Sequence, residues 1–302
     1  MWFGAHLPLI DVDGSQSVPL ARYVEAAQGA GCTAICANDH LVFSRPWLDG
    51  LVALSSVLGS TADMTVATTV ALPVIRGPAT LAKAAAALGE LSGGRFVLGV
   101  GPGSSAADYA AAGIPFDERW PRFDEAVHLL RSWLAGEPET TPGRFYGRPL
   151  LEPQPSQPIP IWIGSWGSAA GLRRVGRLGD GWLASAYNTT PDRIAAGREY
   201  LRADQNRPGR PVRDLPIVLA TMWTHVTESP ARAQAWLDDL ARMLRRDPDT
   251  IAEQLLIGSA DHCVRTLTRF ADAGVDGVVL WPVGDPLDQL RRVGDAVIPH
   301  LR

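Results

Sequence analysis

The amino-acid sequence predicts a closed (β/α)8 barrel, or TIM barrel, and three observations support this fold class. Short β-branched runs alternate with longer helical segments along all 302 residues. The first four strands begin near residues 2, 33, 64 and 96, a spacing of about 31 residues that suits one βα unit. The apolar runs lack alternation, which is typical of parallel strands covered on both faces. An open doubly wound sheet is the alternative, but near-regular repeats without a linker favour closure.

Four βα units occupy the first half of the chain. Strands are expected at residues 2–9, 33–37, 64–72 and 96–100, and helices at 18–30, 48–59, 78–91 and 118–134. The segment at 18–30 is amphipathic and is followed by Gly31, a residue type that commonly ends helices.

Four less even units follow. Strands are expected at residues 161–163, 181–185, 217–226 and 277–281, and helices at 169–178, 192–203, 230–246 and 261–273. A Pro/Gly-rich stretch at 136–160 and a helical stretch at 227–276 lengthen two connections. The sequence therefore predicts one domain over residues 1–302, with insertions after strands four and seven.

Composition argues against several classes of protein. The net charge of −4 disfavours a nucleic-acid-binding surface, and no apolar run reaches the ~18 residues of a membrane span. The segment Met1–His6 runs straight into an apolar stretch without a basic n-region, so no secretory signal is expected. Cys32, Cys36 and Cys263 form an odd set without CxxC spacing, which indicates a reduced, cytoplasmic protein.

Three further classes of site lack the residues they need. Lys83, the one lysine, lies in a helical stretch, whereas a Schiff-base aldolase needs a lysine at a strand end and a P-loop needs GK[ST]. A metallohydrolase barrel would carry HxH on strand one, and only His6 stands there. No metal site is predicted.

Function in such a barrel lies at the carboxyl ends of the strands. Asp39 and His40 follow strand two and form a candidate acid–base pair, because His titrates near neutrality; a capping Asp beside an exposed His is the alternative. Thr69 follows strand three and could bond a planar ligand, or be ordinary strand filler. Gly101 and Gly103 follow strand four, where they admit a ligand or make a tight turn.

Strand five ends in the segment 164–168, which opens a helix. Its residues are Gly164, Ser165, Trp166, Gly167 and Ser168. Free backbone N–H groups and serine hydroxyls at a helix start suit a phosphate; a plain serine N-cap at Ser168 is the alternative.

Histidines and tryptophans lie at other strand ends. His6 and His225 fall near the ends of strands one and seven, with Trp223 and Trp281 nearby. Inward-facing residues of these types more often fill a barrel than take part in chemistry.

Several segments together resemble the bacterial luciferase-like superfamily, in particular its branch of oxidoreductases that use the deazaflavin coenzyme F420. The match runs in order over essentially the whole chain. The segments are residues 31–40, 72–78 with 81–83, 91–101, 122–125, 158–164 and 179–182.

The resemblance implies a flavin-like ring at the carboxyl-terminal mouth, with Asp39 and His40 beside it. It implies a non-prolyl cis bond between Thr69 and Val70 that braces one face of the ring. It implies that the phosphate-bearing tail runs toward residues 165–169 and 101–104. Arg95, Asp124, Glu125 and Asp180 are interpreted as structural residues with local ion pairs.

One position departs from the family pattern. Some relatives carry a Glu just after the strand-four glycines, where it serves as an acid in sugar-phosphate oxidation, and Ser104 stands there in this chain. Asp108, Asp39 or the substrate would then supply the proton, and sugar-phosphate oxidation is in doubt.

The resulting hypothesis is hydride transfer between C5 of coenzyme F420 and a small organic substrate. His40 would stabilise the reduced ring, Asp39 would orient His40 or bond the ring edge, and Trp47, Trp166, Trp223 and Trp281 would form apolar walls. His6 joins Trp47, Trp223 and Trp281 as a candidate substrate-pocket residue. The alternatives are an FMN-dependent monooxygenase and a non-catalytic flavin-binding protein. A homodimer is expected, since relatives pair through barrel helices.

Overall fold

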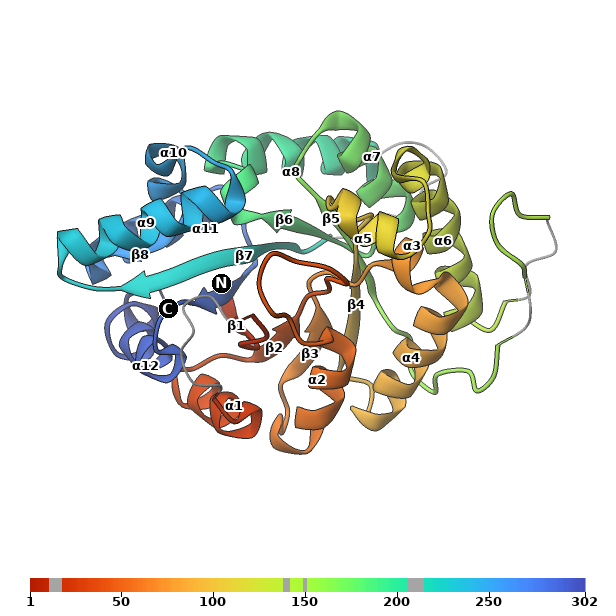
Figure 1. The fold of residues 1–302 in the computed structure, drawn as a ribbon, viewed down its shortest axis with the longest axis horizontal. Coiled ribbons are helices and arrows are strands. Elements are labelled where there is room, and N and C mark those ends of the chain that lie inside the picture. Colours follow the sequence, from red (N-terminus) through yellow and green to blue (C-terminus); the bar gives the residue numbers. More distant parts are fainter. Residues whose placement is uncertain (11–17, 138–141, 149–150, 206–214, 302) are drawn as a thin grey trace.

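Eight parallel strands close into a ring that helices surround (Figure 1). The computed structural model describes residues 1–10, 18–137, 142–148, 151–205 and 215–301. The ring strands are β1 Trp2–His6, β2 Ala34–Ala37, β3 Thr65–Thr68, β4 Phe96–Val100, β5 Ile161–Ser165, β6 Gly181–Ser185, β7 Ile217–Val226 and β9 Gly277–Pro282. Neighbours from β1 to β7 pair in chain order, and β9 closes the ring by pairing with both β7 and β1. The predicted barrel is confirmed.

A ninth strand, β8 Leu256–Gly258, extends the sheet outside the ring. It pairs with residues 224–226 at the far end of β7. A register shift between Leu219 and Met222, with Thr221 at φ +57°, separates this end from the part of β7 that pairs with β6. The sequence prediction missed β8, because three apolar residues between helical segments give no strand period.

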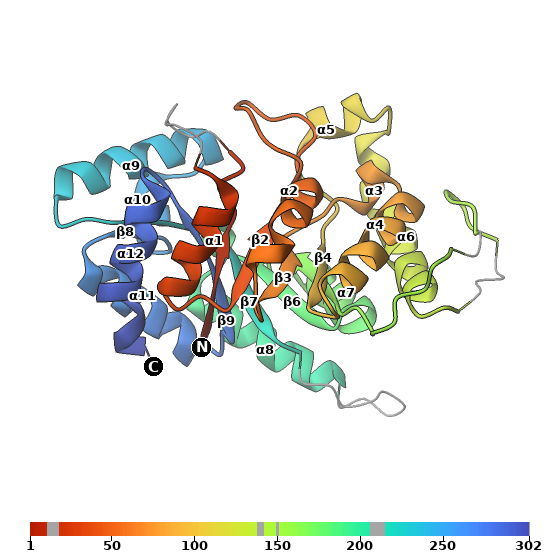
Figure 2. The same cartoon turned by 90° about the horizontal axis from the view of Figure 1, so that it is seen from below.

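Helices form the outer layer in both views (Figures 1 and 2). They are α1 Leu20–Gly29, α2 Gly50–Val57, α3 Pro73–Arg76, α4 Pro78–Leu91, α5 Ala106–Ala111, α6 Arg119–Leu134, α7 Ala169–Leu178, α8 Pro191–Gln205, α9 Pro230–Leu244, α10 Pro248–Ala252, α11 Ala260–Asp272 and α12 Pro286–Ala296. The 3-10 turns are η1 Leu58–Ser60, η2 Phe116–Glu118, η3 Ala186–Asn188 and η4 Ile298–Leu301. The bounds of α4 and α7 agree with the prediction, whereas α3, α5, α10 and α12 were not predicted.

Side-chain caps fix where several helices begin. The carboxylate of Asp49 accepts hydrogen bonds from the backbone of Leu51 and Val52 and starts α2. Ser105 starts α5 and Ser168 starts α7 in the same way. Such caps satisfy backbone N–H groups that have no partner inside the helix. Two of these starts, at α5 and α7, adjoin the predicted site.

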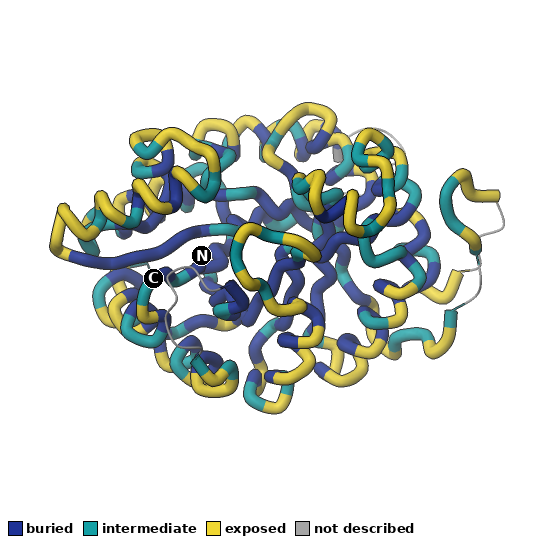
Figure 3. Tube along the Cα trace, viewed as in Figure 1, coloured by how far each residue is buried: buried dark blue, intermediate teal, exposed yellow. Residues whose placement is uncertain are grey.

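The core has an inner and an outer part, and the strands are buried while helices expose their outer faces (Figure 3). A small cluster takes residues from six ring strands, namely Ala34, Cys36, Ala67, Val97, Leu183, Val218 and Val279. A set shared among strands of one ring fills the barrel interior. A much larger cluster packs strands against helices.

Among the described residues, no helix has both the length and the apolar character needed to cross a bilayer. The three cysteines are buried and free, and burial raises the pKa of the Cys32 and Cys263 thiols to about 12.

Candidate functional site

The carboxyl ends of β2 to β5 bring four predicted segments to one mouth of the barrel. Ala37 lies opposite Thr68, Ala71 opposite Val100 and Val100 opposite Ile163. The residues that follow these positions therefore stand side by side. They include Asp39, His40, Thr69, Val70, Gly101 and Gly164.

A buried carboxylate holds His40. Nδ1 of His40 lies 2.9 Å from Oδ2 of Asp108, whose side chain is 1% exposed. Oδ1 of Asp108 accepts hydrogen bonds from the backbone N–H groups of Leu41 (3.2 Å) and Val42 (2.6 Å). With Nδ1–H donating to Asp108, Nε2 is the ring nitrogen left to exchange a proton. An imidazole oriented by a carboxylate in this way has the geometry of an acid or base, and the catalytic role of His40 stays a prediction.

Asp39 belongs to a different network. Its two oxygens accept hydrogen bonds from Nε and Nη2 of Arg76, at 2.5 and 2.8 Å, and Oδ2 also lies 3.3 Å from the backbone nitrogen of Leu72. Arg76 donates further to Asp49 at 2.6 Å. The sequence hypothesis that Asp39 orients His40 is therefore corrected: Asp108 makes that bond, and Asp39 pairs with Arg76. Contact of Asp39 with a ring edge stays a prediction.

The peptide between Thr69 and Val70 is cis, as the resemblance implies. The hydroxyl of Thr69 is buried and has no hydrogen-bond partner in the described structure. A buried hydroxyl without a partner is unfavourable, so it suits a polar group of a ligand.

The mouth glycines make room for Val70. A Cβ at Gly101 would lie 2.8 Å from Cγ2 of Val70, and a Cβ at Gly164 would lie 3.1 Å from Cγ1. Contacts this short displace the neighbour or the backbone. The absence of a side chain at both glycines therefore leaves the space that the Val70 side chain occupies. Gly103, at φ +77°, makes the turn before the exposed Ser104.

The serines after β5 bond their own loop. Oγ of Ser168 accepts from the backbone of Gly171 and caps α7, while Oγ of Ser165 accepts from the backbone of Gly167 at 3.2 Å. The N-cap alternative thus describes Ser168, and a phosphate at residues 164–168 stays a prediction.

Aromatic rings line the opposite strands of the mouth. The imidazole of His6 stacks on Trp281 with ring centroids 3.8 Å apart, and Trp223 stacks on Trp281 at 4.2 Å. Trp47 meets Trp281 edge-on at 5.9 Å and lies 4.7 Å from the His40 ring, which Phe43 also contacts at 4.9 Å. We call His6, Trp47, Trp223 and Trp281 the aromatic wall. Its four members are the predicted substrate-pocket residues, which the structure brings together.

His6 is neutral in this wall. Burial lowers its pKa to about 4. Nδ1 lies 2.6 Å from the carbonyl oxygen of Leu7 and must donate to it, so Nε2 accepts from the backbone N–H of Asn38 at 3.0 Å. The wall therefore carries no formal charge at neutral pH.

Trp166 lies outside the wall, contrary to the sequence hypothesis. Its side chain is 53% exposed, and the guanidinium of Arg246 lies 5.9 Å from its ring. Trp166 follows β5 at the start of α7, where the loop points its indole toward solvent. His225, also considered, is buried, and its Nδ1 lies 2.9 Å from the carbonyl oxygen of Val283.

The motif residues interpreted as structural make local bonds. Asp124 pairs with Arg174 at 2.7 Å, Asp180 pairs with Arg131 at 3.0 Å, and Arg95 donates to the Met64 carbonyl. The carboxylate of Glu125 accepts from the backbone of residues 144–146.

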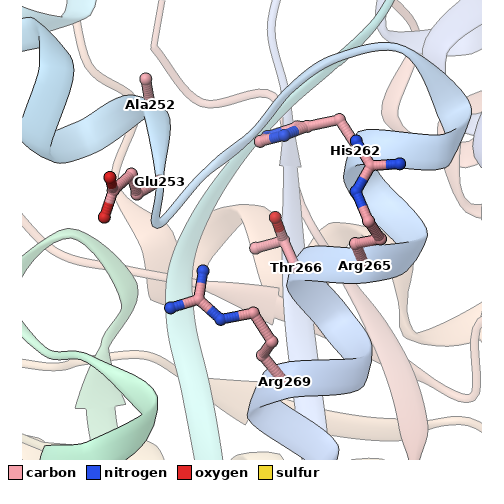
Figure 4. Close-up of a pocket in the computed structure, with 6 residues that line it drawn as sticks. All are labelled: Ala252, Glu253, His262, Arg265, Thr266 and Arg269. Carbon is pink, nitrogen blue, oxygen red and sulfur yellow. The ribbon is translucent and has the colours of Figure 1, made fainter.

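A separate pocket lies in the outer layer between the end of α10 and α11 (Figure 4). Glu253 lines one side, and His262, Arg265 and Arg269 project from α11 on the other. None of its residues was predicted as functional. Within the described ranges, no group of three or more His, Cys, Asp or Glu side chains could hold a metal ion.

Sequence reasoning missed the roles of Asp108 and Arg76. Asp108 was named only as one possible proton donor, because α5 is six residues long and was not predicted. Arg76 was quoted only within a motif. An acidic residue shortly after the strand-four glycines was the one available signal for Asp108.

Known proteins resemble this chain in sequence over much of its length. The sequence model described as luciferase-like monooxygenase matches residues 11–245. An F420-dependent glucose-6-phosphate dehydrogenase of Beutenbergia cavernae is 33% identical over 180 residues, which are 55% of this chain and only 52% of that protein's length. Another of that name, from Nakamurella multipartita, is 27% identical over 94% of this chain and 92% of its own.

A solved structure has the same fold. It is an F420-dependent secondary alcohol dehydrogenase in complex with an F420–acetone adduct, with a TM-score of 0.85, 17% identity, and coverage of 100% of this chain and 99% of that one. The predicted resemblance is confirmed, and the chain belongs to the luciferase-like monooxygenase family.

Proposed function

We propose that the protein is an F420-dependent oxidoreductase that transfers a hydride between C5 of the deazaflavin and a small organic substrate. The observation that carries the proposal is the His40–Asp108 bond of 2.9 Å at the barrel mouth. The names of the F420-dependent relatives support the choice of cofactor.

His40 would serve as the proton-transferring group. Asp108 is buried and both its oxygens accept hydrogen bonds, so it orients the imidazole and does not itself meet the substrate. Nε2 then gives or takes the proton that accompanies hydride transfer. This assignment supplies the acid that the exposed Ser104 cannot.

The residues at the mouth fit a planar ring cofactor. The unpartnered Thr69 hydroxyl offers a hydrogen bond to a ring heteroatom, and the Val70 side chain, seated against Gly101 and Gly164, offers an apolar surface. When bound, the deazaflavin would supply a two-electron redox centre. The aromatic wall keeps water from this region, which strengthens the bonds made by His40.

The first test is cofactor binding. Oxidised F420 and FMN are titrated separately into the protein, and cofactor fluorescence reports binding. We expect F420 to bind at micromolar or lower concentration and FMN to bind more weakly. If FMN binds in that range and F420 does not, the proposal is wrong, and oxygen consumption with reduced FMN then tests the monooxygenase alternative.

The second test is His40→Gln, assayed with a panel of ketones and alcohols. Turnover should fall by about 10²- to 10⁴-fold, the usual contribution of a general acid or base, while F420 still binds. His128→Gln, on the exposed face of α6, is the matched control and should leave both unchanged. Turnover that survives His40→Gln would refute the role of His40, and wild-type protein that binds F420 but turns over nothing would indicate a non-catalytic binding protein.

A further inference from the structure

Helix α5 joins two loops of the barrel mouth through adjacent side chains. Figure 2 shows α5 beside the loop that follows β2. Asp108 and Tyr109 are the two buried residues of this helix, each 1% exposed. Successive residues of a helix point about 100° apart, so the two side chains reach different neighbours. Asp108 bonds residues 40–42, whereas the hydroxyl of Tyr109 donates to the carbonyl oxygen of Pro102.

Tyr109 attaches the glycine loop, residues 101–104, to α5. Among the described residues, no hydrogen bond other than the one from Tyr109 holds residues 102–104. A Cβ at Gly103 would lie 3.7 Å from Cε2 of Tyr109, so the loop also lies close to the ring. Burial raises the pKa of Tyr109, so its hydroxyl keeps the proton that it donates. The hydroxyl and the ring of Tyr109 therefore fix the position of the glycine loop relative to α5.

The position of α5 depends mainly on these two side chains. The helix has six residues, and its other four are exposed alanines. A helix this short is not stable without tertiary contacts. The Tyr109 ring meets Phe116 edge-on, with ring centroids 5.2 Å apart, and Asp108 is bonded on the side of His40. A displacement of the helix at Tyr109 therefore also displaces Asp108, because one rigid turn carries both.

We propose, building on the function proposed above, that Tyr109 is a positioning residue for His40. Tyr109 holds α5 against the glycine loop, α5 carries Asp108, and Asp108 orients the imidazole. The glycine loop, toward which the phosphate-bearing tail of the cofactor is predicted to run, is thereby kept at a set distance from the acid–base group. Tyr109 takes no part in the chemistry itself.

Hydrogen exchange in the cofactor-free protein, followed by NMR, tests this link. The backbone N–H groups of Leu41 and Val42 donate to Asp108, so their exchange rates report whether those bonds open. Tyr109→Phe keeps the ring and removes the bond to Pro102. We expect it to raise the exchange rates of both amides by about five- to tenfold, the effect of one lost hydrogen bond. Unchanged rates at both amides overturn the proposal.

Tyr23→Phe is the matched control. Tyr23 is fully buried on α1, and its hydroxyl donates to a backbone carbonyl oxygen, that of His6, at 2.8 Å. The substitution therefore removes the same kind of bond away from α5. We expect a similar loss of stability in urea and unchanged exchange at Leu41 and Val42. Equal increases in exchange in the two variants would show general loosening of the fold and refute a specific role for Tyr109.

The proton on Nδ1 of His40 gives a second, spectroscopic readout. Its NMR signal, assigned by its absence in His40→Gln, should be present in the wild type and in Tyr23→Phe. In Tyr109→Phe the signal should be lost, because a displaced Asp108 exposes that proton to exchange with water. A signal retained in Tyr109→Phe contradicts the proposal.

The outcomes separate the two proposals. Neither NMR measurement uses a cofactor, so failure of F420 to bind rejects the proposed function and leaves the link between Tyr109 and His40 to be tested. Binding of F420 together with unchanged exchange in Tyr109→Phe rejects only the role of Tyr109.

Discussion

Two sides of the barrel mouth differ in how their side chains are held. On the side of β2, β3 and β4, charged groups are fixed by hydrogen bonds: Asp108 holds His40, and Arg76 holds Asp39. On the side of β1, β7 and β9, neutral rings are fixed by stacking, with His6 and Trp223 on either face of Trp281. Trp47 connects the two sides, since its ring contacts both His40 and Trp281.

The charged side of the mouth is suited to proton transfer, whereas the aromatic side sets the shape of the site. Hydrogen bonds fix the position of a side chain to within a few tenths of an ångström and favour one of its protonation states. Stacking instead fills space and excludes water. Changes on the charged side should therefore affect turnover and the energy of buried charges. Changes on the aromatic side should affect ligand fit and the response of stability to pH.

The largest expected effect is that of Asp108→Asn. Asparagine keeps an oxygen for the backbone N–H groups of Leu41 and Val42 but no longer offers His40 a carboxylate. We expect turnover to fall by about 10²-fold or more, with F420 affinity unchanged, because the imidazole loses the carboxylate that orients it. Steady-state kinetics and cofactor fluorescence measure the two quantities.

Ser105→Ala is the control for Asp108→Asn. Oγ of Ser105 accepts from the backbone of Asp108 and caps α5, without touching the carboxylate. Stability should fall by about 1 kcal/mol, while turnover stays within about twofold. Equal losses of turnover in both variants would mean that Asp108 matters only for folding of the loop.

These residues also show what the sequence could predict. The period of about 31 residues holds for the first four βα units, and the alternation of strands and helices continues less evenly through the last four, so the barrel, its order of strands and the segments at its mouth follow from the chain. Gly101 and Gly164 were singled out because they lie at strand ends, and the cis peptide between Thr69 and Val70 followed from the family resemblance. The three-residue strand β8 did not, because it forms only by pairing with the bulged end of β7.

Partners of charged side chains were harder to predict. Asp39 and Asp108 are both aspartates near His40 in space, and the sequence places only Asp39 next to it. The path of the chain after β4 determines which aspartate bonds His40, because it brings α5, with Asp108, against residues 40–42. The predicted homodimer depends on surfaces of two chains and stays a prediction.

Arg76→Met tests the second charged pair. It leaves the carboxylate of Asp39, which is 6% exposed, without its cation. We expect a loss of about 3 kcal/mol in the free energy of unfolding, near the lower end for a broken buried pair, because Arg76 is partly exposed. Urea denaturation measures this, and adding Asp39→Asn should recover most of the loss by removing the unpaired charge.

Arg177→Met provides the comparison for Arg76→Met. Arg177 pairs with Asp124 at 3.1 Å, but its side chain is 55% exposed. Exposed pairs contribute at most about 1 kcal/mol. If Arg76→Met proves no more destabilising than Arg177→Met, Asp39 does not depend on its partner.

The smallest expected effect concerns His6 and pH. In the unfolded chain His6 titrates near 6.5, and burial lowers its pKa to about 4 in the folded protein. Between these values the unfolded chain binds a proton that the folded protein does not, so stability falls as pH is lowered through this window, by about 2 kcal/mol at pH 5.

In His6→Gln the amide can still donate to the Leu7 carbonyl and accept from Asn38, but it does not titrate. The free energy of unfolding of the wild type should therefore approach that of His6→Gln between pH 6.5 and 5. His225, whose pKa burial also lowers, is present in both proteins and cancels. Parallel curves for the two proteins would show that His6 can be protonated in the fold, and the aromatic wall could then carry a positive charge and accept an anionic substrate.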